Sequence, residues 1–311
     1  MTAHDVVACA RKRLGIKRVG HAGTLDPLAA GVLPVAVGAA TRLLPYLAGG
    51  KEYLAEVAFG RTTTTGDAAG ATIVEAPADV AEADLQAVLP RFRGEVLQVP
   101  PAVSAVHVGG RRAYALARAG IAVEIPPRRV VISALEIVRF GPGPVVLLRV
   151  ACSAGTYIRS LAVDIGEALA VPAYLSFLLR TRAGPFDIAG ADLLSDPDWR
   201  LVGPGAALAN LPTIAVSDEE AERLRRGQPI TARAGGAEVA SRLSDAGTEA
   251  CATDAAGETG LRAGRDAGAR SSEPEACATD AAGVARAMRS DDLVAIVVGR
   301  DGAYWPRTVM P

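Results

Sequence analysis

The sequence predicts an α+β fold with a large N-terminal domain followed by a small β-rich one. Two β-rich runs, 130–140 and 145–152, flank a Gly-Pro-Gly-Pro turn and indicate a hairpin. Apolar residues at helical spacing indicate a helix over 158–169. Because the composition changes further along the chain, we expect domains at 1–212 and 213–311.

The other expected elements follow from local patterns. Thr2 and Asp5 form a capping-box pattern at the start of a helix that continues to Leu14. Further along we expect strands at 32–37, 53–59 and 71–75, short helices at 39–47 and 84–93, the second of them capped by the acids before it, a helix at 218–226, and two strands within 291–310.

Charge is distributed unevenly along the 311 residues. The net charge is −1, but residues 1–190 hold 20 Lys and Arg against 15 Asp and Glu, a net of +5. Residues 191–311 are acidic, with a net of −6. The N-terminal part could therefore present a basic face to a polyanion, and ordinary solvated surface is the alternative interpretation.

Several classes of protein are disfavoured. The histidines are scattered and no cysteines form a C-x-x-C pair, so we expect no metal site. The uncharged runs are shorter than a membrane helix and are broken by Pro and Gly, so we expect no membrane association. A reducing cytoplasm is the expected compartment. The cysteines are Cys9, Cys152, Cys251 and Cys277.

Asp26 is the one acidic residue in the loop 20–34, between glycine-bearing turns and an apolar run. Pro27 disfavours the α region for Asp26, so its carboxylate lies on an extended or turn backbone. Loops of this kind commonly carry catalytic groups. The alternative is a turn aspartate that hydrogen-bonds its own backbone.

Arg159 stands in the first turn of the expected helix 158–169, where the helix dipole disfavours a cation. Either an anion lies beside the guanidinium, or the side chain extends to water.

Two segments differ from the rest in composition. Residues 100–128 are basic and bracketed by prolines, which indicates an extended arm. Residues 232–287 have almost no large apolar side chains, and Glu249–Gly257 recurs as Glu275–Gly283, 26 residues further on. We expect a disordered insertion there, created by a local duplication.

Four stretches carry motif-like patterns in order: 20–27 with Gly31 and 38–42, then 51–53, 155–160 and 179–186. Together they resemble the bacterial tRNA pseudouridine synthases of the TruB type. The likeness covers residues 2 to about 212 and continues weakly into the last 20 residues. It implies a pseudouridine-synthase fold, with a mixed, mainly antiparallel sheet, flanking helices, a thumb arm at 100–128 and a small PUA-like C-terminal domain.

The resemblance implies isomerisation of uridine 55 in the T-loop of tRNA, without metal or organic cofactor. Asp26 would be the nucleophile, attacking the ribose anomeric carbon or the pyrimidine ring. Arg159 would keep that carboxylate ionised, and Tyr53 would stack on the flipped uracil. Tyr157 and Leu179 would line the pocket.

The resemblance also implies contacts to the T-arm of tRNA by a monomeric enzyme. His21 would fill the space that the flipped nucleotides vacate. Basic side chains would bind phosphates, which positions the RNA without reading its sequence. They are Arg42, Lys51, Arg111, Arg112, Arg180 and Arg182.

One departure and two rival functions stay open. Members of this family carry a further strand with a Lys-Pro motif before the equivalent of Thr2, so we expect that strand to be missing here.

One rival is a non-catalytic tRNA-binding module or RNA chaperone that uses the same basic surface. The other is an RNA glycosidase, which a carboxylate near an anomeric carbon would also serve.

Overall fold

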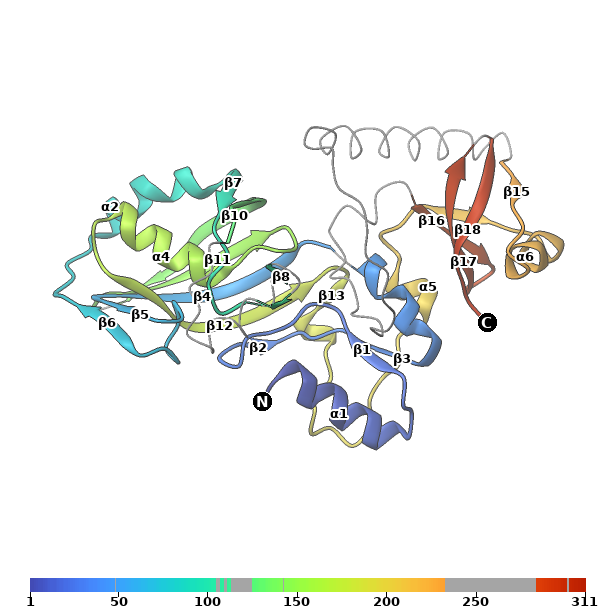
Figure 1. Cartoon of the computed structure of the whole chain (residues 1–311), viewed down its shortest axis with the longest axis horizontal. Coiled ribbons are helices and arrows are strands. Elements are labelled where there is room, and N and C mark those ends of the chain that lie inside the picture. Colours follow the sequence, from blue (N-terminus) through green and yellow to red (C-terminus); the bar gives the residue numbers. More distant parts are fainter. Residues whose placement is uncertain are drawn as a thin grey trace, which may run out of the picture. The chain divides into compact units, whose positions relative to one another are not determined.

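A computed structural model of the chain describes residues 1–47, 49–104, 107–108, 111–112, 125–141, 143–232, 284–300 and 302–311. The chain divides into two compact units (Figure 1). The first comprises 1–14, 23–35 and 49–197, and the second comprises 15–22, 36–48 and 198–311. Each unit is described separately below. The division into functional domains after residue 212 stays a prediction.

The first unit is built on a seven-stranded sheet. Its order is β13 (Phe186–Asp187), β12 (Ala173–Ala183), β4 (Lys51–Phe59), β11 (Val145–Cys152), β10 (Arg128–Phe140) and β7 (Gly94–Gln98), and β2 (Ala30–Gly31) pairs with β12. The β2–β12 pair is parallel and the other pairs are antiparallel. The expected mixed, mainly antiparallel sheet is confirmed.

Helices cover one face of this sheet (Figure 1). Alternate residues of β4, among them Tyr53, Ala55 and Val57, pack into a core with α4 (Ile158–Ala168). The helix α2 (Glu82–Val88) and the 3-10 helix η2 (Leu89–Phe92) complete this layer. The other face carries charged groups: Arg149 on β11 bonds Glu52 on β4 and Glu136 on β10.

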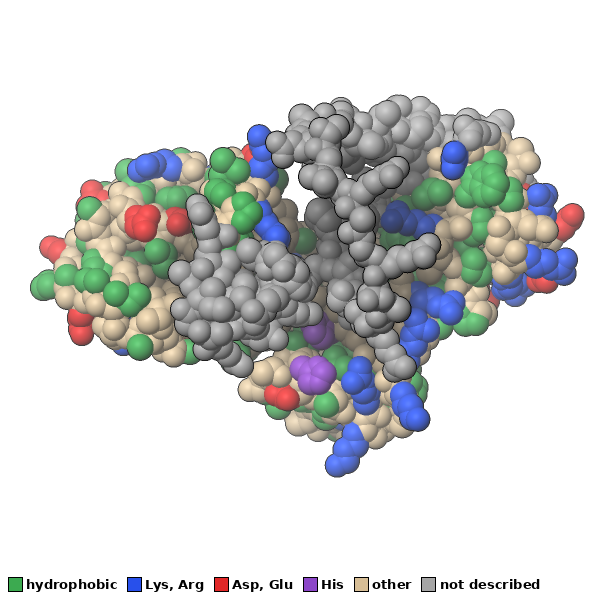
Figure 2. Space-filling view, in the orientation of Figure 1, with side chains coloured by type: hydrophobic (Ala, Val, Ile, Leu, Met, Phe, Trp, Pro, Cys, Tyr) green, Lys and Arg blue, Asp and Glu red, His purple; other side chains and the backbone are tan. Residues whose placement is uncertain are grey.

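Smaller elements of this unit follow the sequence closely. The helix α1 (Ala3–Leu14) begins with the expected capping box, since Thr2 N donates to Asp5 Oδ2 (2.7 Å) and Asp5 N donates to Thr2 Oγ1 (3.2 Å). Figure 2 shows Lys and Arg side chains over α1. The remaining elements are β5 (Arg61–Thr63), β6 (Thr72–Glu75), β8 (His107–Val108), β9 (Arg111–Arg112) and the 3-10 helix η3 (Ile188–Gly190).

Two local expectations are wrong. The N-cap of α2 is Ala81, whose position provides no side-chain hydrogen bond, so the preceding acids do not cap this helix. The strand expected at 32–37 is confined to β3 (Val35–Val37), because Val32 N donates instead to Arg180 O (2.9 Å).

The second unit contains a five-stranded sheet with the order β14 (Thr213–Ala215), β16 (Val284–Arg289), β17 (Asp292–Arg300), β18 (Ala303–Val309) and β15 (Ile230–Thr231). Its C-terminal part is therefore β-rich, as expected. The helix α6 (Asp218–Arg225) begins with a capping box between Ser217 and Glu220. The other elements are β1 (Val19–His21), the 3-10 helix η1 (Gly38–Leu47) and α5 (Pro204–Ala207).

The two unusual segments are described only in part. Residues 284–287 belong to β16, so the expected insertion 232–287 extends too far at its C-terminal end. Residues 233–283 lie outside the described residues. Within the expected arm 100–128, residues 105–106, 109–110 and 113–124 also lie outside them, and β8 pairs with β9.

Among the described residues, the longest helices are too short or too polar to traverse a lipid bilayer.

Candidate active site

Asp26 and Arg159 form a two-pronged ion pair in the first unit. Arg159 Nε donates to Asp26 Oδ2 (2.8 Å) and Nη2 donates to Oδ1 (3.0 Å). The Arg159 side chain is 5% exposed, whereas that of Asp26 is 35% exposed. The carboxylate is therefore held from one side by a buried cation and open on the other.

Backbone carbonyls and a second acid fix the Arg159 guanidinium. Nη1 donates to Thr65 O (3.0 Å) and Nη2 also donates to Val103 O (2.9 Å). Asp67 Oδ2 lies 3.7 Å from Nε. Because planar guanidinium donors are directional, these contacts fix both the position and the plane of the group.

Asp67 was missed in the sequence. It lies in the polar run between β5 and β6, which is typical of a turn, yet its side chain is only 8% exposed. Its Oδ1 accepts from Thr65 Oγ1 (2.6 Å) and from Ala69 N (3.0 Å), so Oδ2 is left facing Arg159. A lone acid among threonines and glycines was the only available signal.

The helix α4 delivers Arg159 to this place. Its buried residues Ile158, Leu161 and Ile165 pack on the sheet, and Tyr157 is the N-cap. The unfavourable position of a cation in the first turn is offset by the acids beside it. Of the two interpretations of Arg159, the nearby anion is the one observed.

Tyr53 lies on β4 directly opposite Arg180 on β12. Its side chain is buried, and burial raises the pKa of its hydroxyl to about 12, an effect that the nearby Arg180 charge partly opposes. Leu179 precedes Arg180 and pairs with Ala30 of β2, just beyond the Asp26 turn. Tyr53 and Leu179 thus come from adjacent strands beside the loop that carries Asp26.

Arg180 is buried, whereas a residue that binds RNA phosphates must be exposed. It has no exposed surface, and its guanidinium donates to Val32 O (2.7 Å), Gly23 O (3.1 Å) and Thr24 O (3.5 Å). A buried guanidinium cannot reach RNA in this conformation. Arg180 instead binds the backbone on both sides of Asp26.

Gly31 shows how closely this loop lies on β12. Its φ is +105°, and a Cβ there would lie 2.2 Å from Arg180 O. Only glycine fits such an approach of two backbones. Lys51 also reaches the loop, since its Nζ would lie 3.1 Å from a Cβ on Gly23.

The other expected RNA contacts are dispersed. Arg182 is exposed and lies opposite Glu52, on the sheet face away from Tyr53. His21 and Arg42 belong to the second unit, where Arg42 Nη1 donates to Val309 O (3.2 Å). The backbones of Arg111 and Arg112 form β9, and their side chains lie outside the described residues.

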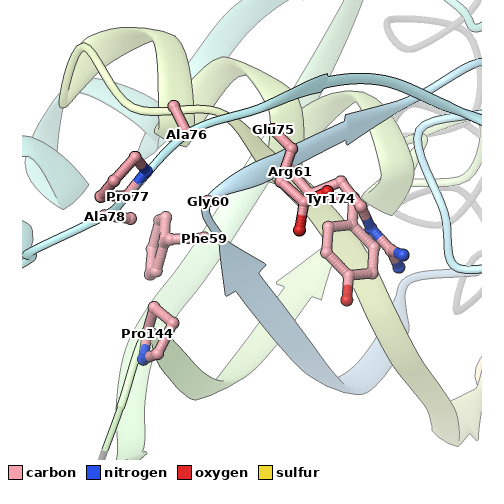
Figure 3. Close-up of a pocket in the computed structure, with 9 residues that line it drawn as sticks. All are labelled: Phe59, Gly60, Arg61, Glu75, Ala76, Pro77, Ala78, Pro144 and Tyr174. Atoms are coloured by element: carbon pink, nitrogen blue, oxygen red, sulfur yellow. The ribbon is translucent and has the colours of Figure 1, made fainter.

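Two cavities lie away from the ion pair. One of about 550 Å³ is at the far end of β4, where the Arg61 guanidinium stacks 4.3 Å from the Tyr174 ring centre (Figure 3). Another, of about 540 Å³, lies between α4 and β7 and includes Gln98 and Asp164 in its lining. Across the described stretches, His, Cys, Asp and Glu side chains form no group of three able to hold a metal ion.

Known proteins now supply an independent comparison. Residues 11–158 match the model for the N-terminal domain of TruB family pseudouridylate synthases. The chain is 51% identical over 234 residues to tRNA pseudouridine synthase B of Symbiobacterium thermophilum, covering 73% of this chain and 78% of that protein. The chain belongs to the TruB family of pseudouridylate synthases. Members of this family are isomerases, so the resemblance seen in the motifs is confirmed.

Further relatives agree with this membership. The tRNA pseudouridine synthase B of Moorella thermoacetica is 49% identical over 244 residues, covering 74% of this chain and 80% of that protein. The solved archaeal box H/ACA sRNP Nop10-Cbf5 complex aligns over 100% of this chain and 83% of the other at 26% identity and a TM-score of 0.63. The solved structure of an H/ACA RNP bound to a substrate RNA containing 2'-deoxyuridine is 25% identical in sequence to this chain, with a TM-score of 0.61. The expected pseudouridine-synthase fold is thus confirmed.

Proposed function

We propose that this TruB family member converts uridine 55 in the T-loop of tRNA to pseudouridine, with Asp26 as nucleophile. The observation that carries the proposal is the Asp26 carboxylate, held by Arg159 on one side and open on the other. The relatives' names supply the tRNA substrate. The flipped uridine would approach from the open side.

The proposed reaction rearranges bonds within one nucleotide. The Asp26 carboxylate attacks the ribose anomeric carbon or the pyrimidine ring, and the N1–C1′ bond breaks. The base turns, a C5–C1′ bond forms, the bond to the Asp26 carboxylate breaks, the proton on C5 leaves, and N1 gains a proton. No electrons are gained or lost overall, so the reaction as written needs no redox cofactor.

Arg159 and Asp67 would set the charge of the site. A guanidinium with two bonds to a carboxylate fixes the orientation of both oxygens, so Arg159 would aim the Asp26 nucleophile. Asp67, at 3.7 Å, would share the Arg159 charge and limit its hold on Asp26. Asp26 would thereby be oriented without being locked in an inert pair.

Tyr53, Tyr157 and Leu179 would hold the flipped base. With a pKa of about 12, the Tyr53 hydroxyl is neutral at physiological pH and would stack and hydrogen-bond as a phenol. A role for Tyr53 in removing the C5 proton would require a base that takes up its own proton in turn.

We also propose how the RNA is bound. Lys51, Arg42 and the basic arm 100–128, which includes Arg111 and Arg112, would contact phosphates of the T-arm. His21 would occupy the space left by the flipped base, and 213–311 would form the RNA-binding C-terminal domain. The enzyme would act as a cytoplasmic monomer.

The test compares wild type with Asp26→Asn on an unmodified T-arm stem-loop. Carbodiimide mapping should detect pseudouridine at the target uridine for wild type and none for Asp26→Asn, while the RNA dissociation constants agree within about threefold, since the isostere keeps the shape of the loop. Product from Asp26→Asn would disprove the nucleophile assignment. Free uracil from wild type would support a glycosidase, and tRNA folding by Asp26→Asn without product would reveal a separate chaperone role.

A further inference from the structure

A short segment that begins at the last residue of β7 is bound tightly to the start of α4. Residues 98–103, here called the β7 stem, make four hydrogen bonds to residues 157–160. Two come from Gln98; in addition, Ser160 Oγ donates to Val99 O (2.8 Å) and Arg159 Nη2 donates to Val103 O (2.9 Å). Two of the bonds fall on the N-cap and two on the first turn of the helix that carries Arg159.

Gln98 uses both ends of its amide on one residue. Its Nε2 donates to Tyr157 O (2.9 Å), and its Oε1 accepts from Tyr157 N (2.7 Å). The residue is 3% exposed, so water does not replace these bonds. A primary amide offers a donor and an acceptor at this spacing at every physiological pH.

Tyr157 is the position where such a clamp has most effect. It is the N-cap of α4, and no side chain caps the helix there. Its carbonyl also accepts from Leu161 N (3.1 Å), the first hydrogen bond of the helix. Gln98 therefore fixes the peptide groups on both sides of the residue at which α4 begins.

We propose that Gln98 is a positioning residue for the isomerisation put forward above, on which this inference rests. By fixing Tyr157 it sets where the first turn of α4 lies, and Arg159 projects from that turn. Arg159 makes two bonds to Asp26 and one each to two carbonyls, all between 2.8 and 3.0 Å. Hydrogen bonds of this length lose alignment when their donor shifts by a fraction of an ångström.

The decisive variant is Gln98→Glu, which keeps the shape and makes the donor depend on pH. A protonated carboxyl can accept from Tyr157 N and donate to Tyr157 O, whereas a carboxylate faces that carbonyl with a second acceptor. Burial favours the neutral carboxyl of the Gln98→Glu variant. Its deprotonation should therefore occur at a pH above the ordinary pKa range of glutamate. The clamp should therefore be intact at low pH and broken at high pH.

The measurement is the single-turnover rate on saturating T-arm RNA from pH 5 to 8.5, expressed at each pH as a ratio to wild type. The ratio should fall about tenfold or more as pH rises, because small misplacements of catalytic groups slow reactions by up to about 100-fold. Gln86→Glu is the matched control, since Gln86 is an exposed glutamine on α2 that bonds Glu82, and its ratio should stay flat.

Gln98→Met tests the same inference without titration. It removes both bonds and should slow turnover about 10-fold to 100-fold at every pH, with the RNA dissociation constant within about threefold of wild type. A flat ratio for Gln98→Glu, or normal turnover by Gln98→Met, would overturn the positioning role while wild type still makes pseudouridine. Absence of pseudouridine from wild type would overturn the proposed function and this inference together.

Discussion

Two arginines lie on either side of the Asp26 loop, and they differ in what they bind. Both residues are at most 4% exposed. Arg159 has carboxylate oxygens of Asp26 and Asp67 within 4 Å. Arg180 bonds three loop carbonyls, and no carboxylate of the described residues lies within 4 Å of it. Arg159 therefore acts through its charge, and Arg180 through the geometry of its donors.

The difference explains how the backbone of a loop and its one acidic side chain can be held by separate groups. Carbonyls satisfy Arg180 without drawing on the Asp26 carboxylate, so the backbone is fixed by one cation and the side chain is oriented by another. A single arginine serving both purposes would couple the shape of the loop to the ionisation of Asp26. Substitutions can separate the two effects.

The largest expected effect is at Arg159. Arg159→Met should slow turnover by at least about 100-fold, because it removes the cation beside Asp26 and leaves Asp67 buried without it. Arg159→Lys keeps the charge and should retain more activity than Arg159→Met. Single-turnover assays with RNA held above its dissociation constant provide the comparison. Equal activity of the two variants would contradict a role through charge.

At Arg180 we expect lysine to be no better than methionine, and the loss to be in stability. Arg180→Lys and Arg180→Met should both lower the melting temperature by about 5 °C or more, because an ammonium on this chain cannot serve three separate carbonyls. Calorimetry would measure this change. If Arg180→Lys instead kept the wild-type melting temperature and only weakened RNA binding, the phosphate contact expected from the sequence would be right after all.

Asp164, a half-buried acid, supplies the smallest effect. Asp164 on α4 bonds no described residue, and burial, with a smaller contribution from Glu167, raises its pKa to about 6. The folded pKa is above the unfolded one, so its contribution to stability is present below about pH 4 and is lost as pH rises through about 6. Asp164→Asn should therefore raise the melting temperature by a few degrees at pH 7.5.

At pH 4 the same substitution should give no gain. Asp79→Asn is the control, since Asp79 is an exposed acid in the segment between β6 and α2. Equal effects of Asp164→Asn at both pH values would show that charge burial is not the cause. The two arginines are charged groups with hydrogen-bond partners, whereas Asp164 bonds no described residue. The three sets of variants would therefore compare the effects of charges with and without such partners.

The ion pair of Asp26 and Arg159 could be predicted because both members break local rules. Asp26 is an acid in an apolar loop before a proline, and Arg159 is a cation at the wrong end of a helix. The motif resemblance then joined them, and their two hydrogen bonds confirm the contact. Their chemical roles stay predictions.

Arg180 shows why other parts could not be predicted. It occupies a buried position in β12. A charged residue at a buried position interrupts the alternation of apolar and polar residues by which a strand is identified, so no strand was expected there. Its partners lie 148 to 157 residues earlier in the chain. Burial of an arginine depends on such distant carbonyls, which local sequence does not reveal. Asp67 was missed for the same reason, because local sequence does not distinguish an exposed acid in a turn from a buried one.

The distance along the chain between the loop and its supports has a consequence for synthesis on the ribosome. Asp26 is made 133 residues before Arg159 and 154 residues before Arg180, whose donors shape its loop. The nascent loop cannot take its final form until β12 has left the exit tunnel. Nascent chains that stall before β12 would thus carry every residue of the loop without the Arg180 contacts that hold its backbone.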